Sequence, residues 1–168
     1  MKRFLIAALV TFAAFRVFAM EPQIVGSAHA SGGYDHKDMA IVVVVNPIEK
    51  GRVWLNARYS YQLLFSERDS LLYMVRMAAR QIDVAVANKT TISYGRVVGR
   101  FSTEGAALVT VSFATDGYEA SYVVVQITSQ RGGDVLLFNK RDIQDFIDVL
   151  GRARNLVDDY QRQAALFK

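Results

Sequence analysis

The chain of 168 residues contains no cysteine. This absence excludes disulfide bonds, thiol nucleophiles, thiolate metal sites and the lipid-modified cysteine of a lipoprotein. Histidine is scarce as well: there are only His29 and His36, although acid–base catalysis and metal binding most often use this side chain. The glycine-rich phosphate loops and the G-x-S-x-G turn of common enzyme families are also missing. We therefore predict no catalytic residue, no metal ligand and no cofactor, and we do not expect an enzyme.

What the N-terminus does contain is the pattern of a secretory signal peptide over residues 1–19. Lys2 and Arg3 precede a run at residues 4–15 that is apolar except for Thr11. Arg16 ends this run before it reaches the length of about 20 apolar residues that a membrane-spanning helix needs. We expect the segment to be cleaved, which leaves no stable membrane span.

Two alanines satisfy the small-residue rule for the cleavage site. We favour Ala19, because it lies close behind the apolar run, and Ala30 is the alternative. A cleaved leader predicts a periplasmic or secreted protein. Without residues 1–19 the chain has 17 Lys and Arg against 16 Asp and Glu. This near-neutral balance argues against nucleic acid as a partner.

The remaining chain has the length of one domain. Glycine, serine and charged residues over 20–38 favour a flexible lead-in, and residues 39–168 are expected to form a single domain. We predict an α+β fold, in which an antiparallel sheet of about five strands carries one internal helix and a long C-terminal amphipathic helix. The internal helix is expected near residues 67–86. The expected strands lie at 39–46, 52–66 and 91–101 and in a three-stranded meander over 106–138.

The C-terminal helix has a clear start and a clear apolar face. Asn139 is a typical N-cap residue. Apolar residues then recur at helical spacing, while charged residues occupy the opposite side. We expect this helix to cover the sheet with its apolar face, which consists of Ile143, Phe146, Ile147, Leu150, Ala153, Leu156, Val157 and Tyr160.

The stretch 52–66 alternates strictly between apolar residues on one face and mostly polar residues on the other, which predicts one long, half-buried strand. It also contains the best candidates for ligand or partner contact, namely Trp54, Arg58, Tyr59 and Tyr61. Aromatic rings next to an arginine are suited to stacking and to protein interfaces. The alternation places both tyrosines on the apolar face and Trp54 on the other face.

These features favour a non-enzymatic, exported binding or assembly module of the bacterial cell envelope. Its partner would be an envelope protein or a second copy of the chain, held through a sheet edge or the exposed side of the C-terminal helix. The alternative is a periplasmic carrier of a small apolar ligand, bound between the sheet and the C-terminal helix. Its pocket would be lined by Tyr59, Tyr61, Phe65, Phe146 and Leu150.

Overall fold

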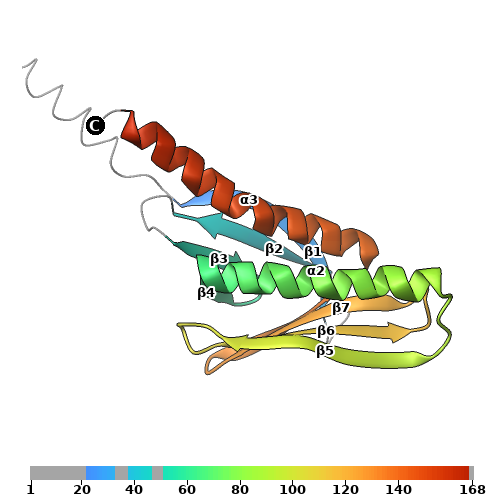
Figure 1. The fold of residues 1–168 in the computed structure, drawn as a ribbon. Coiled ribbons are helices and arrows are strands. Elements are labelled where there is room, and N and C mark those ends of the chain that lie inside the picture. Colours follow the sequence, from blue (N-terminus) through green and yellow to red (C-terminus); the bar gives the residue numbers. More distant parts are fainter. Residues whose placement is uncertain (1–21, 33–37, 47–50, 167–168) are drawn as a thin grey trace, which may run out of the picture.

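The computed structural model describes residues 22–32, 38–46 and 51–166. Within these residues the chain forms eight strands and two helices (Figure 1). The expected signal peptide at residues 1–19 lies outside them. The strands are β1 (Gln23–Gly32), β2 (Asp38–Val45), β3 (Arg52–Asn56), β4 (Ser60–Leu64), β5 (Ser93–Ser102), β6 (Leu108–Asp116), β7 (Ser121–Ser129) and β8 (Gly132–Phe138), and the helices are α2 (Phe65–Ala87) and α3 (Lys140–Ala165).

All eight strands belong to one antiparallel sheet with the order β4-β3-β2-β1-β8-β7-β6-β5. The sheet therefore consists of two four-stranded meanders, β1–β4 and β5–β8, which meet in the middle. Their junction is short, because β1 and β8 pair only at Ser31 with Leu137 and at Gly32 with Leu136 within the described residues. Other contacts must hold the two halves together.

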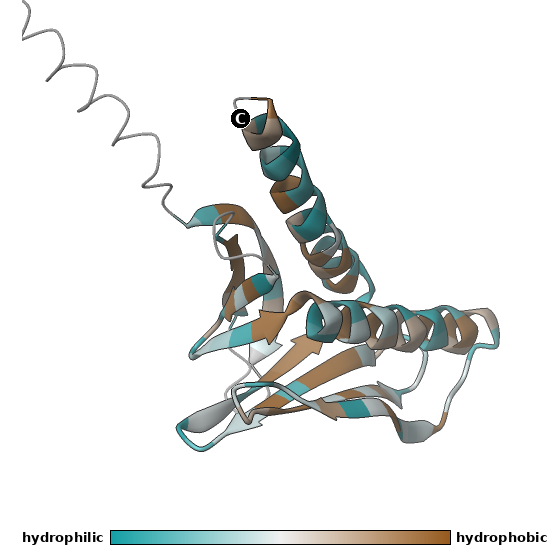
Figure 2. Cartoon of the chain, turned by 60° about the vertical axis from the view of Figure 1, so that its left-hand side comes forward, coloured by the Kyte–Doolittle hydropathy of each residue, from teal (hydrophilic) through white to brown (hydrophobic). Residues whose placement is uncertain are grey.

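The two helices lie on the same side of the sheet, and each packs mainly on the meander that it does not follow (Figure 1). Helix α2 follows β4 in the chain but lies on β6 and β7. Helix α3 follows β8 in the chain but lies on β1 and β2. The buried core is continuous from one half to the other. Figure 2 shows hydrophobic residues along the strands beneath α2. Each meander thus depends on the other for the helix that covers its apolar face.

The α+β class and the antiparallel sheet are confirmed, but the expected number of about five strands is wrong. One missed strand is β1, which lies within the expected flexible lead-in at residues 20–38. Its buried side chains are only Ala28 and Ala30, so hydrophobic periodicity does not reveal it. A Cβ atom on Gly26 would lie 3.1 Å from Cγ2 of Val149 on α3. Close packing of the helix on this central strand therefore favours small residues here.

The other error concerns the single strand expected over residues 52–66: the hairpin β3–β4 ends at Leu64, and α2 begins at Phe65. Val53 pairs with Leu63, and Leu55 pairs with Tyr61. These four residues are buried on the same face. The hairpin loop contains three residues, so the alternation keeps its phase from one strand to the next. The apolar pattern is therefore identical for a long strand and for this hairpin.

Both expected helices are present, and the cap of the second is confirmed. The Asn139 side chain accepts hydrogen bonds from the N–H groups of Arg141 and Asp142, at 2.8 and 3.0 Å. At the start of α2, Oε2 of Glu67 accepts a hydrogen bond from the N–H of Leu64 at 2.7 Å. These side chains satisfy backbone groups that a helix end leaves unpaired.

Candidate functional site

The four contact residues expected from the sequence lie in two different places. Trp54 is half-buried on the sheet face that points away from the helices, where it pairs with Val44 and Gln62. It borders a shallow hollow of about 380 Å³ that also involves Pro22 and Asn56. Trp54 is thus separated by the thickness of the sheet from the two tyrosines, which lie on the helix side.

Tyr59 and Tyr61 pack against the turn between β7 and β8. The Tyr61 hydroxyl donates a hydrogen bond to Oδ2 of Asp134 at 3.0 Å, and the Tyr59 N–H donates to the same oxygen at 3.1 Å. The ring of Tyr59 also fills the space beside Gly132, where a Cβ atom would lie 2.6 Å from Cζ of the ring. Arg58 is exposed, with its guanidinium 5.9 Å from the centre of the Tyr59 ring. These tyrosines therefore join the two halves of the sheet.

The contact between Tyr61 and Asp134 shows how strongly the sheet curls. Strands β4 and β8 are four places apart in the sheet, which would be about 19 Å in a flat sheet. The tyrosine nevertheless reaches the carboxylate, because the β3–β4 hairpin bends towards the second meander. A second link closes the same side: Nη2 of Arg52 lies 3.3 Å from Oε2 of Glu104. The N–H of Glu104 also donates to Oε1 of Glu67 on α2, at 2.6 Å.

The residues expected to line a ligand pocket do not share one cavity. Tyr61 contacts β8 near its start, at Asp134. Phe146 stacks on Phe138 at the end of β8, with ring centroids 4.7 Å apart. Four residues of strand span about 13 Å, so these aromatic residues occupy separate places. Phe146 and Leu150 are fully buried in the core.

A different surface, the groove between α2 and the edge strand β5, has the features of a binding site. Its floor is a hollow of about 150 Å³ lined by Met77 and Gln81 of α2, by Arg96 and Val98 of β5, and by Phe113 of β6. A cavity of this size holds a group as large as benzene. The groove can therefore accept one aliphatic side chain.

Helix α2 lies close to β5 because Gly99 has no side chain. A Cβ atom at Gly99 would lie 2.2 Å from Sδ of Met74, so the methionine occupies that space. The pairing of β5 with β6 is also irregular between Val97 and Gly99. The regular part of the free edge is thus Ser93–Val97, directly beside the groove.

Large apolar side chains of α2 and β5 are exposed to solvent. Tyr73 and Val84 of α2 are 66% and 50% exposed, and Tyr94 of β5 is 47% exposed. The Tyr94 ring stands over Phe113, with ring centroids 6.3 Å apart. Strand β5 contains ten residues, most of them exposed, and forms one edge of the sheet. Exposed apolar residues beside an unpaired strand edge are typical of a protein interface.

The opposite edge of the sheet is less accessible. Strand β4 has only five residues. It faces a hollow of about 480 Å³ that is also lined by the turns at residues 103–107 and 129–131 of the second meander. The longer and more exposed edge is therefore β5.

The charge of the groove is positive. Arg96 lines it, and Arg80 lies three residues after Met77 on the same side of α2. In the described residues neither arginine forms an ion pair; Nη1 of Arg80 lies 4.0 Å from Sδ of Met77. Asp83 points elsewhere and pairs with Lys140 at 2.7 Å.

The sequence analysis did not identify this groove, although one pattern indicates it. Tyr73, Met77, Arg80 and Val84 follow one another at intervals of three or four residues and share one side of α2. This second stripe lies on the side of the helix opposite the buried stripe. Three large apolar residues on the solvent side of a helix predict a contact surface.

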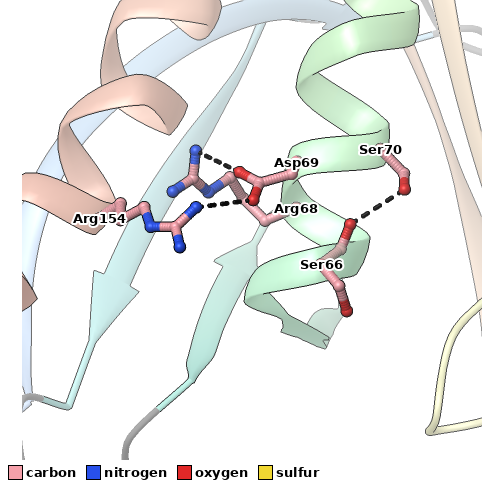
Figure 3. A network of polar contacts seen from close by, with 5 residues as sticks. All are labelled: Ser66, Arg68, Asp69, Ser70 and Arg154. Atoms are coloured by element: carbon pink, nitrogen blue, oxygen red, sulfur yellow. Dashed lines mark hydrogen bonds and ion pairs between the residues drawn. The ribbon is translucent and has the colours of Figure 1, made fainter.

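The interface between α2 and α3 contains a buried arginine (Figure 3). Arg68 is 3% exposed, and its Nη1 lies 2.9 Å from Oδ1 of Asp69. Its Nε and Nη2 atoms have no hydrogen-bond partner in the part of the chain that the structure describes. Burial lowers the pKa of Arg68, and the neighbouring Asp69 opposes this effect. Arg154 of α3 binds the second oxygen of Asp69 at 3.0 Å, so the carboxylate links the two helices.

The described residues provide no grouping of three or more His, Asp or Glu side chains that could hold a metal ion. Neither helix within these residues is long and apolar enough to cross a membrane. A comparison of the sequence with models of protein families and with curated proteins gives no match. A functional proposal must therefore come from the geometry of the chain.

Replacing either partner of the Tyr61–Asp134 contact should destabilise the protein. Tyr61→Phe removes one hydrogen bond, which we expect to cost about 1–2 kcal/mol, whereas Asp134→Ala leaves the buried hydroxyl unpaired and costs about 2–4 kcal/mol. Urea unfolding measures both, with the exposed Tyr73→Phe as a control that stays near wild type. Equal stability of all three variants would contradict this account.

The same contact makes stability depend on pH in the alkaline range. Burial, followed by the hydrogen bond to Asp134, raises the pKa of Tyr61 above its ordinary value of 10.0. The protonated Tyr61 hydroxyl provides its full stabilisation at a pH below 10.0, the pKa that applies to the unfolded chain. This stabilisation is lost as the pH rises above that pKa. The stability difference between wild type and Tyr61→Phe should therefore shrink above pH 10.

The buried arginine predicts an unequal response to mutation. Asp69→Asn leaves the Arg68 charge without its partner and should cost about 2 kcal/mol, a value reduced from that of a fully buried pair because Asp69 is 44% exposed. Arg154→Gln should cost less than about 1 kcal/mol, because this side chain is exposed. Arg68→Met should be neutral or stabilising. A large loss of stability in Arg68→Met, measured by urea unfolding, would contradict this order.

Proposed function

We propose that the protein is a non-enzymatic, exported binding or assembly module of the bacterial cell envelope. In this proposal it acts through protein–protein contacts in the groove between α2 and β5. The observation that carries the proposal is the long, exposed edge strand β5, which contains the exposed Tyr94 and lies beside the hollow lined by Met77 and Phe113. A strand of a partner can add to such an edge, while its side chains enter the neighbouring groove.

Export is supported by the leader pattern at residues 1–19. Cleavage after Ala19 would leave the whole of β1, which begins at Gln23. Cleavage after Ala30 would remove most of this strand, including the buried Ala28. We therefore propose that the mature protein begins at Met20 and lies in the periplasm or is secreted.

Site-specific photo-crosslinking in producing cells tests both parts of this proposal. A photoreactive phenylalanine analogue replaces Tyr94 in the groove or, as a control, Tyr122, which is also exposed but lies on β7. We expect a discrete adduct with another protein from position 94 and none from position 122. The intact mass of the recovered, uncoupled protein should correspond to a chain that begins at Met20.

A filled groove provides the specificity control for this experiment. Gln81 lines the hollow, so Gln81→Trp should occupy it and abolish the adduct from position 94 without unfolding the protein. Equal adducts from both positions would contradict docking in the groove, and so would an adduct that persists in Gln81→Trp. A recovered protein that retains residues 1–19 would contradict export with cleavage.

A further inference from the structure

The charge and shape of the groove specify the kind of segment that it can bind. We propose that the groove binds an extended, acidic segment of another protein, which pairs with β5 as an additional strand. This inference rests on the proposed function, because it assumes that the groove is the docking site. It adds the chemistry of the partner to that function.

The backbone of β5 provides the pairing surface. Its residues pair with β6 on one side, and no other strand pairs with it within the described residues. An edge strand leaves backbone N–H and C=O groups unpaired on its free side. The regular part, Ser93–Val97, is long enough to align five residues of an added strand. Main-chain hydrogen bonds of this kind give affinity with little dependence on sequence.

The groove selects side chains on one face of the added strand. Successive residues of a strand point to opposite faces, so every second residue of the segment would face α2. One of these side chains can enter the hollow of about 150 Å³ between Met77 and Val98. Its floor includes Phe113, which favours an aliphatic group.

The arginines of the groove favour acidic residues in the bound segment. Arg80 and Arg96 are not ion-paired within the described residues, so their charges are available to a partner. Asp116, at the end of β6, accepts a hydrogen bond from the Ser93 hydroxyl at 2.5 Å. A segment with Asp or Glu two residues before or after its apolar residue, and so on the same face of the strand, would therefore complement the groove.

A second copy of the chain does not supply this complement. Strand β5 has the sequence SYGRVVGRFS, which contains two arginines and no acidic residue. Pairing between two β5 strands would bring Arg96 and Arg100 of both copies to one edge. Like charges opposite one another destabilise a pair of strands. The charge pattern therefore favours a different protein as the partner.

Binding of three synthetic peptides to the mature full-length protein tests the inference. Each peptide has six residues and a fluorescent label. Position 3 is valine, positions 1 and 5 are both glutamate, both lysine or both serine, and positions 2, 4 and 6 are serine, so that the valine and the varied residues share one face of the strand. Fluorescence anisotropy measures the dissociation constants at low and at physiological salt. We expect the glutamate peptide to bind at least about tenfold more tightly than the lysine peptide. Its affinity should fall as salt is added, because salt screens exposed charges.

Two arginine variants assign the effect to the groove. Arg96→Glu reverses a charge in the groove and should reverse the preference between the glutamate and lysine peptides. Arg100→Glu is the matched control on the same strand: Arg100 pairs with Thr110, on the sheet face opposite to that of the buried Val109 and Val111. It should leave the preference for glutamate unchanged. Circular dichroism confirms that both variants are folded.

The outcomes separate this inference from the proposed function. Equal binding of the three peptides, unchanged in Arg96→Glu, would overturn acidic selection and leave docking in the groove intact. Failure of every peptide to bind would also overturn the inference, while the adduct from position 94 would still decide whether the groove is a docking site. An adduct between two copies of this chain would overturn the acidic partner in favour of self-association.

Discussion

Each meander is covered by the helix that follows the other meander in the chain. The rest of the structure depends on this constraint. Helix α2 follows the first meander and covers β6 and β7, and α3 follows the second and covers β1 and β2. Separating the halves would expose both apolar faces to water, which is unfavourable in proportion to the exposed area. The central junction of β1 and β8 can therefore be short. The contacts of Asp134 with Tyr59 and Tyr61 then close the curled side of the sheet.

The same arrangement places the proposed docking groove. Helix α2 must lie over the second meander, and its buried stripe packs there on β6 and β7. Met77 and Gln81 of the helix then lie beside β5, while Tyr73 and Val84 remain exposed on its outer side. Edge strands commonly carry charged residues that prevent uncontrolled pairing with other chains. In our proposal the charge of Arg96 disfavours pairing with a second copy of the chain and favours an acidic partner. One side chain then both rejects the wrong partner and attracts the right one.

The sequence predicts the parts of the fold that have strong local patterns. The apolar stripe of α3 and its Asn139 cap identify that helix, and the run at 39–46 identifies β2. Strand β1 is not predictable in this way, because close packing of α3 requires small residues such as Gly26 and Ala28 in place of large apolar ones. Among the predicted contact residues, Tyr61 is buried and donates a hydrogen bond to Asp134. The sequence does not reveal this contact, because the two residues are 73 positions apart. The groove escapes prediction because its walls come from α2 and β5, whose relative position depends on the whole sheet.

Residue-resolved hydrogen exchange of the isolated mature protein, measured by NMR at low concentration, tests the central claim most directly. The account predicts rapid exchange for those amides of residues 93–97 that point away from β6, because no strand pairs with them. Amides of β7, which pairs on both sides, should exchange far more slowly. Protection of every β5 amide to the level of β7 would show that the edge is already covered, and it would contradict a free docking groove.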